Sequence, residues 1–115
     1  MKTIKLTTRN QNEFIDPTED QIIQAVGELK ISDPEHPNCW IELGFESDFG
    51  WSTISLDAYE SGLIIYSEWE DQDDDDPKVE LRFNSDSRET IGLFNKLNDE
   101  KTEELKQLIT KRSTE

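Results

Sequence analysis

The sequence contains one cysteine and one histidine among 115 residues, and this scarcity excludes several kinds of site. Cys39 cannot form a disulfide within the chain, and Cys39 with His36 falls short of the four ligands of a structural zinc site. The same two residues are the only candidates for a thiol nucleophile and its base, but His36 lies in a loop bounded by prolines. We therefore predict no metal, no cofactor and no catalytic residues, and a small, buried Cys39.

Long hydrophobic runs are also absent. No apolar stretch approaches the roughly 20 residues that a membrane-spanning helix needs. The first nine residues alternate in polarity and lack the apolar core of a signal peptide. These features predict a protein that stays in the cytoplasm and does not bind membranes.

Motifs for phosphate and calcium are missing as well. The chain has no glycine-rich phosphate loop. The four aspartates at 73–76 lack the glycine and the terminal glutamate spacing of an EF-hand. Paired carboxylates could serve as acid and base, but acids are so abundant that no pair stands out. We predict that the protein is not an enzyme, and keep a small carboxylate-based enzyme or a ligand-binding domain as the least favoured alternative.

Hydrophobic residues make up 32% of the chain and charged residues 34%, a balance that can leave a chain disordered. Three tryptophans, five phenylalanines and well-spaced Ile and Leu favour instead a modest core. The length suits one domain, so we predict a single acidic α+β domain over residues 1–115.

Positive charge is scarce in the middle of the chain. Residues 31–80 hold 15 acids against the single base Lys78, a net charge of −14 out of −15. A field of one sign over one surface speeds encounter with an oppositely charged partner and repels nucleic acid and anionic membranes. The pattern predicts a basic protein partner and no direct nucleic-acid binding, although a surface kept acidic for solubility is an equal alternative.

The N-terminal third predicts a strand followed by a helix. Residues 3–8 alternate in polarity and are rich in threonine, as in a half-buried strand. Asp16 precedes Pro17 and Glu19, which predicts a helix over residues 17–30 with Asp16 as its N-cap. The two prolines of segment 32–38 predict a loop.

Four segments then predict an antiparallel meander, namely 39–45, 50–58, 63–69 and 79–83. The acidic tract 71–77 separates the last two and is expected to be an exposed hairpin loop. Asp86 is placed to cap a second helix, and after Asp99 the apolar pattern continues as a bend or as a third helix capped by Asp99. The prediction is one antiparallel sheet of about four to five strands, with an N-terminal helix and a C-terminal helix or helix pair on one face.

Period-two alternation divides the strands into two faces. Turning Ile41, Leu43 and Leu56 toward the helices places Trp40, Glu42 and Trp51 on the opposite face. The third strand of the meander is ambiguous, and leaves either Trp69 or Glu68 outside.

Exposed aromatic side chains often dominate binding energy, so we predict a partner-binding surface; the alternative is that these rings cover the sheet or pack under loops. The predicted contacts are the aromatic and acidic residues Trp40, Glu42, Asp48, Trp51, Glu68, Trp69, Glu70, Asp71, Asp73, Asp74, Asp75 and Asp76.

Two stretches of sequence resemble small immunity proteins of bacterial polymorphic and contact-dependent toxin systems. These are Asp16 to Val26, with its Pro-Thr-x-x-x-Ile-x-x-Ala helix start, and Trp40 to Leu43 at the head of the strand-rich region. The resemblance covers roughly residues 15–97. It implies a protein that neutralises one cognate toxin, usually by occluding its active site, with no catalytic residues to transfer. The aspartate tract departs from many relatives and leaves the toxin class open.

The acidity of the chain favours a nuclease as the toxin, because a carboxylate surface can occupy a cleft that binds phosphates. The alternative is an acidic adaptor or nucleic-acid mimic that regulates a DNA-binding protein. The sequence leaves the oligomeric state open.

Overall fold

The computed structural model describes residues 2–48, 50–71 and 73–113, which form one antiparallel sheet and three helices. Along the chain the elements are β1 (Lys2–Thr7), β2 (Glu13–Ile15), α1 (Glu19–Glu28), β3 (Asn38–Ser47), β4 (Gly50–Tyr59), β5 (Leu63–Trp69), β6 (Val79–Asn84), α2 (Ser87–Asn98) and α3 (Thr102–Ser113). The strand order is β2-β1-β3-β4-β5-β6, so β3 to β6 form the predicted meander. The α+β class is confirmed, with six strands instead of four to five.

The strand that the sequence did not predict is β2 at the edge of the sheet. A turn through Gln11, whose φ is 66°, reverses the chain, and the Thr8 N–H donates to the Asn12 carbonyl at 2.9 Å. Phe14 then stands opposite Leu6 and packs against the core. Three residues are too few to show an alternating pattern, which is why β2 escaped prediction.

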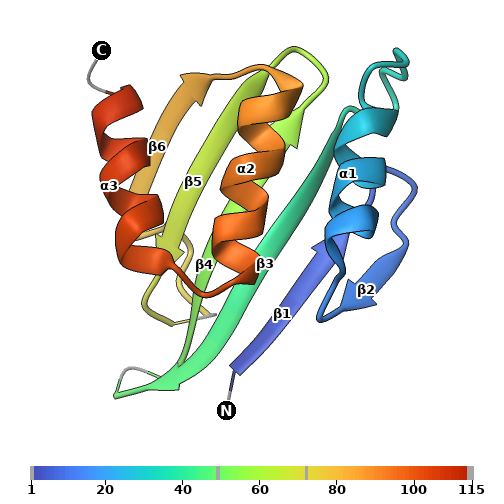
Figure 1. Cartoon of the computed structure of the whole chain (residues 1–115). Helices are drawn as coiled ribbons and strands as arrows, with labels where there is room; N and C mark the ends of the chain where they lie inside the picture. Colours follow the sequence, from blue (N-terminus) through green and yellow to red (C-terminus); the bar gives the residue numbers. More distant parts are fainter. Residues whose placement is uncertain (1, 49, 72, 114–115) are drawn as a thin grey trace.

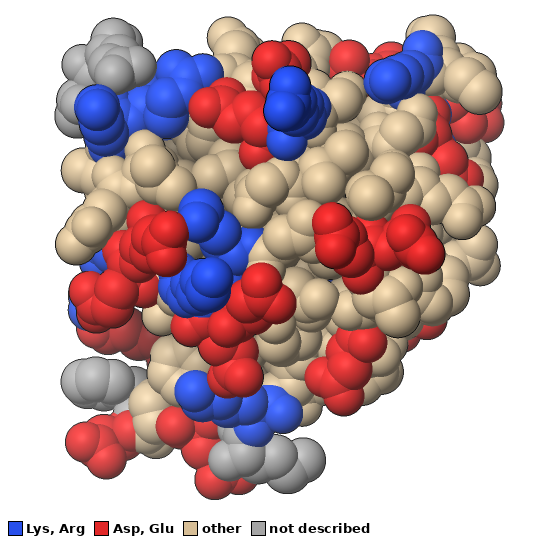
Figure 2. All heavy atoms as spheres, viewed as in Figure 1, with Lys and Arg blue, Asp and Glu red and all other residues tan. Residues whose placement is uncertain are grey.

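All three helices lie over the same face of the sheet (Figure 1). Lys, Arg, Asp and Glu side chains are interspersed on the helix-covered side, so both signs of charge are present there (Figure 2). The opposite face has no helix of the described residues over it (Figure 1). The sheet is therefore covered on one side only.

Helix α1 begins two residues later than predicted, and its N-cap is Thr18, so the prediction of Asp16 was wrong. The Gln21 N–H donates to Thr18 Oγ1 at 3.2 Å, and the Thr18 N–H donates to Gln21 Oε1 at 2.9 Å. This is a reciprocal capping box, which satisfies two helix-end donors. Asp16 instead has a φ of 50° and donates its N–H to the Ile4 carbonyl, which ties the approach to α1 onto β1.

Helices α2 and α3 are separate. Asp86 caps α2 as predicted, accepting the Glu89 N–H at 2.8 Å. Asp99 is the C-cap of α2 and not the N-cap of α3, so that alternative was wrong. Glu100, with a φ of 61°, breaks the helical path before α3 begins.

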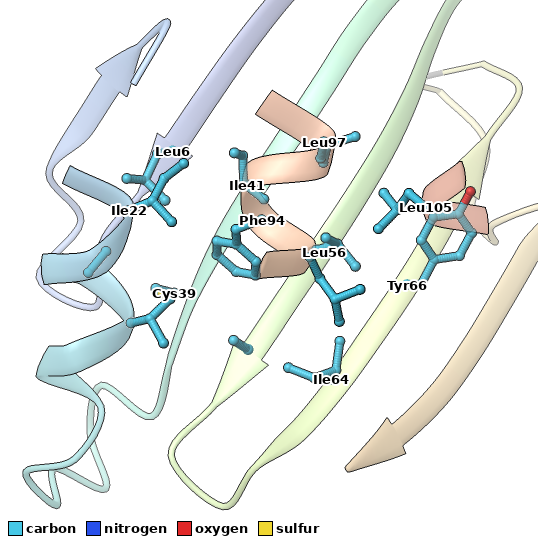
Figure 3. Close-up of a cluster of buried hydrophobic side chains, with 14 of the residues drawn as sticks. Leu6, Ile22, Cys39, Ile41, Leu56, Ile64, Tyr66, Phe94, Leu97 and Leu105 are labelled. Carbon is cyan, nitrogen blue, oxygen red and sulfur yellow. The ribbon is translucent and has the colours of Figure 1, made fainter. Parts of the chain in front are cut away.

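The core lies between the helices and the covered face of the sheet (Figure 3). Ile41, Leu43 and Leu56 are buried on that face, as the alternation predicted. The ambiguity in β5 is resolved because Ile64 and Tyr66 are also buried there. By the same alternation Trp69 belongs to the uncovered face.

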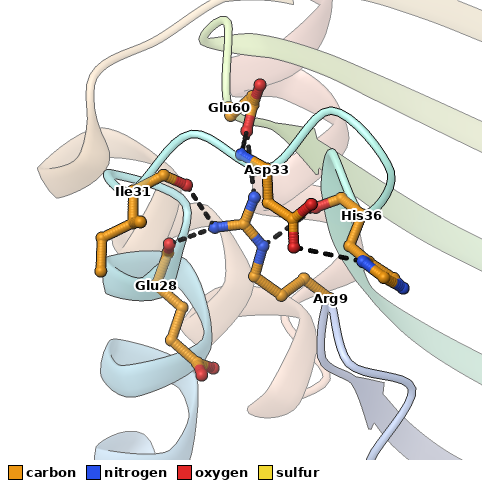
Figure 4. A network of polar contacts seen from close by, with 6 residues as sticks. All are labelled: Arg9, Glu28, Ile31, Asp33, His36 and Glu60. Carbon is orange, nitrogen blue, oxygen red and sulfur yellow. Dashed lines mark hydrogen bonds and ion pairs between the residues drawn. The ribbon is translucent and has the colours of Figure 1, made fainter.

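A buried guanidinium fixes the chain around the end of α1 (Figure 4). Arg9 donates to the backbone carbonyls of Glu28, Ile31 and His36, and its Nη2 lies 3.0 Å from Glu60 Oε2. Through these bonds Arg9 holds together the end of α1, the loop that follows it and the turn after β4.

Candidate functional site

The uncovered face of the sheet carries an open groove of about 790 Å³. Its lining comes from β1 to β5 together with Asp74 of the loop that follows β5. The aromatic part of the lining is formed by all three tryptophans, Trp40, Trp51 and Trp69, each of them partly buried. The groove therefore brings together the three indoles that the sequence placed on separate strands.

Trp51 packs across the backbone of β3. A Cβ built on Gly44 would lie 2.6 Å from Trp51 Nε1 and 2.7 Å from Cζ2, closer than side chains pack. Gly44 thus leaves the space that the indole fills. Trp51 therefore covers part of the sheet, which was the alternative to an interface role, and it also lines the groove.

Trp40 and Asp57 are cross-strand partners on β3 and β4. Such partners have Cβ atoms about 4.5–5.5 Å apart. Glu42 follows on the same face of β3, and Lys5 of β1 lies 3.3 Å from its carboxylate and 3.8 Å from that of Glu13. Lys5 is therefore paired with the carboxylates of Glu42 and Glu13, and not with that of Asp57.

The Asp57 carboxylate has no hydrogen bond and no ion pair within the described residues. Burial, and then the negative charge of Glu42, raise the pKa of its carboxyl from 3.8 to about 6. Around neutral pH the groove therefore holds a partly buried carboxylate that the fold does not neutralise.

The acidic tract lies at the other end of the groove. Asp73, Asp74, Asp75 and Asp76 are exposed, as predicted for a hairpin loop. The Asp73 N–H donates to Asp71 Oδ1 at 3.0 Å and the Asp71 N–H donates to Asp74 Oδ2 at 3.2 Å, so Asp71 is hydrogen-bonded to both Asp73 and Asp74. Of these residues, Asp74 lines the groove itself.

The remaining predicted contacts lie elsewhere. Asp48 is exposed in the turn after β3, and Glu70 pairs with Lys78 at 3.2 Å. Glu68 lies on the helix-covered side, where it accepts the Tyr66 hydroxyl at 2.8 Å and pairs with Lys106 of α3 at 3.1 Å. It does not line the groove.

Sequence reasoning did not select Asp57, Gly44 or Ile15 for this site. Ile15 is 59% exposed on the short edge strand and lines the groove. Asp57 could have been found, because it shares the parity of Trp51 along β4. Its position opposite Trp40 follows only from the register of the hairpin.

His36 and Cys39, which the sequence analysis considered as a catalytic pair and set aside, occupy a different region. The His36 ring lies 3.1 Å from the Asp33 carboxylate. Cys39 is fully buried, and burial together with Asp57 raises the pKa of its thiol to about 12. The thiol is protonated at neutral pH, so this arrangement does not support a thiolate nucleophile.

The described residues contain no group of three or more His, Cys, Asp or Glu side chains placed to hold a metal ion. In the same part of the chain, no helix has the length and apolar character needed to span a membrane. In comparisons with protein-family models, curated proteins and solved structures, nothing matched this chain.

Proposed function

We propose that this protein is an immunity protein, which binds and neutralises a cognate bacterial toxin in the cytoplasm of the cell that makes the toxin. The observation that carries the proposal is the uncovered sheet face, where three indoles and an unneutralised carboxylate share one groove. Such a combination suits protein binding, since aromatic anchors supply much of the energy of an interface.

The charge of the groove supports a basic partner. Glu13, Glu42, Asp57 and Asp74 line it against the single base Lys5, a net charge of −3 when all are ionised. The exposed aspartates of the tract extend this field at one end of the groove. A field of one sign accelerates encounter with a basic surface, and the indoles then provide the docking contacts.

A nuclease is the toxin class that this chemistry favours. Enzymes that act on nucleic acids present cationic surfaces to phosphates, and a carboxylate surface can take the place of the substrate. Two segments, Asp16 to Val26 and Trp40 to Leu43, resemble the sequences of immunity proteins. This resemblance adds independent support for a toxin as the partner.

The test is to co-express this chain with the product of the adjacent open reading frame. We expect rescue of growth, a stoichiometric complex, and loss of both when Trp40 and Trp69 are changed to alanine. The matched control is Leu108→Ala, which removes a 40% exposed apolar side chain from α3. Binding only to a DNA-binding protein unrelated to a toxin would replace the proposal with the nucleic-acid mimic. Turnover of a small molecule without a protein partner would replace it with an enzyme.

A further inference from the structure

We propose that the Trp40 end of the groove is a binding site for an arginine side chain of a basic protein partner. The cross-strand pair Trp40 and Asp57 places an indole and a carboxylate side by side. A guanidinium is planar, so it can stack on an indole while its N–H groups bond a carboxylate in the plane. This inference rests on the proposed function, because the arginine belongs to the protein partner proposed there.

The fold does not use the Asp57 carboxylate for its own stability. Within the described residues nothing donates a hydrogen bond to it, whereas Glu42 and Glu13 share Lys5. Burying a charge without a partner is unfavourable, and the raised pKa of Asp57 expresses this cost. An incoming cation would offset the cost, which makes Asp57 the group in the groove with most to gain from a ligand.

The surrounding charges favour a cation over an anion. On the same face the charged groups of the other strands include Glu42 on β3, Lys5 on β1 and Arg82 on β6. Lys5 is held by two carboxylates, and Arg82 is paired with Glu80 at 2.6 Å. Neither base is therefore directed to Asp57, and the net charge of the groove attracts a guanidinium.

The second end of the groove gives the ligand a direction. Trp51 stands six residues before Asp57 on β4, a distance of about 20 Å along an extended strand. A partner segment that places arginine at Trp40 can therefore extend toward Trp51 and Trp69. The Trp40 end then offers one indole beside the Asp57 carboxylate, and the other end offers two indoles near Asp74.

The experiment uses the whole chain and a peptide probe, acetyl-Gly-Arg-Gly-amide, followed by the three indole N–H signals in a nitrogen-15 correlation spectrum. Trp→Phe variants assign the signals. We expect the Trp40 signal to shift most, and the citrulline peptide, which has the same shape without charge, to bind at least about tenfold more weakly. The lysine peptide should bind more weakly than arginine, because an ammonium cannot stack and bond in one plane.

Asp57→Asn should weaken the arginine peptide about tenfold, and Glu42→Gln should weaken it less. The matched control is Asp20→Asn, which removes one carboxylate from the exposed start of α1. Affinity of the unmodified protein should fall between pH 7.5 and pH 5 as Asp57 takes up a proton, and that change should vanish in Asp57→Asn.

An unchanged Trp40 signal would overturn the inference, as would equal binding of arginine and citrulline or equal affinity in Asp57→Asn and Asp20→Asn. These outcomes are separate from those for the proposed function. A toxin complex that tolerates Asp57→Asn would leave the function standing without the arginine site. Peptide binding at Trp40 in the absence of any toxin partner would support the arginine site and leave the proposed function without support.

Discussion

The indole of Trp51 occupies the space that a side chain at Gly44 would need, with Nε1 only 2.6 Å from the position of a Cβ. Gly44→Ala must therefore displace the ring or the strand, and we expect a loss of about 1–3 kcal/mol of unfolding free energy. Urea denaturation followed by tryptophan fluorescence measures both the loss and the new environment of the ring.

The control for this substitution is Gly92→Ala in α2. Nothing lies within 4 Å of a Cβ at this exposed position, and alanine is the better helix former. Gly92→Ala should stabilise the protein by about 0.5–1 kcal/mol. Equal effects of the two substitutions would contradict the packing of Trp51 on Gly44.

Asp57→Asn should stabilise the protein at neutral pH, although it removes a charged residue from the surface groove. A carboxyl whose pKa is raised by folding contributes stability when protonated and loses that contribution as pH rises from 3.8 to about 6. Asparagine cannot ionise, so the variant should gain about 1–3 kcal/mol above pH 6 and nothing below pH 3.8.

Urea denaturation of both proteins at pH 3.5, 5 and 7.5 gives this difference directly. Asp20→Asn, at the exposed start of α1, should show no comparable gain between pH 5 and pH 7.5. Destabilisation by Asp57→Asn at pH 7.5 would mean that the carboxylate has a structural partner.

Thr18→Ala should destabilise the protein by about 0.5–2 kcal/mol, because it removes the hydroxyl that accepts the Gln21 N–H. Thr18→Ser keeps that oxygen and should unfold near the wild-type midpoint. Asp16→Gly should also cost little, since glycine adopts the positive φ of this position and the Asp16 side chain does not cap α1. Thermal denaturation of the three variants distinguishes the caps, and a larger loss in Asp16→Gly than in Thr18→Ala would reverse the assignment.

Changing Asp73, Asp74, Asp75 and Asp76 to asparagine should slow association with a basic partner and flatten its salt dependence. Exposed charges act mainly on the association rate, and at physiological ionic strength they are screened over about 8 Å. Trp69→Ala should instead raise the dissociation rate. Surface binding kinetics at two salt concentrations measure both rates.

The control removes four carboxylates from the helix-covered side, at Glu19, Asp20, Glu28 and Glu103. If it slows association as much as the loop variant does, the total charge of the protein matters and the position of the acidic tract does not.

Local sequence patterns predicted the parts of the fold that depend on neighbouring residues. Alternation assigned Trp40 and Trp51 to the uncovered face because β3 and β4 each mix apolar with polar side chains. The same rule failed in β5, where four consecutive residues, Leu63 to Tyr66, are apolar or aromatic and both parities fit. The side of Glu68 was therefore decided by tertiary packing against α3.

Sequence patterns also could not choose between two residues that can fill the same structural role. Asp16 and Thr18 can each cap a helix, and the choice fell to Thr18 because the positive φ of Asp16 joins α1 to β1. The groove depended on strand register, which brings Asp57 opposite Trp40 from seventeen positions away in the sequence. Composition indicated acids and aromatics, but it could not indicate which carboxylate would remain without a partner.

The burial of Cys39 also makes this protein convenient to label. Its thiol is inaccessible, and with a pKa of about 12 it forms almost no thiolate at the pH at which maleimide dyes react. A second cysteine introduced on an exposed helix position, such as Gln107, would therefore be modified alone, without first replacing Cys39. A fluorophore attached there lies on the side of the molecule away from the groove, where it can report binding without obstructing it.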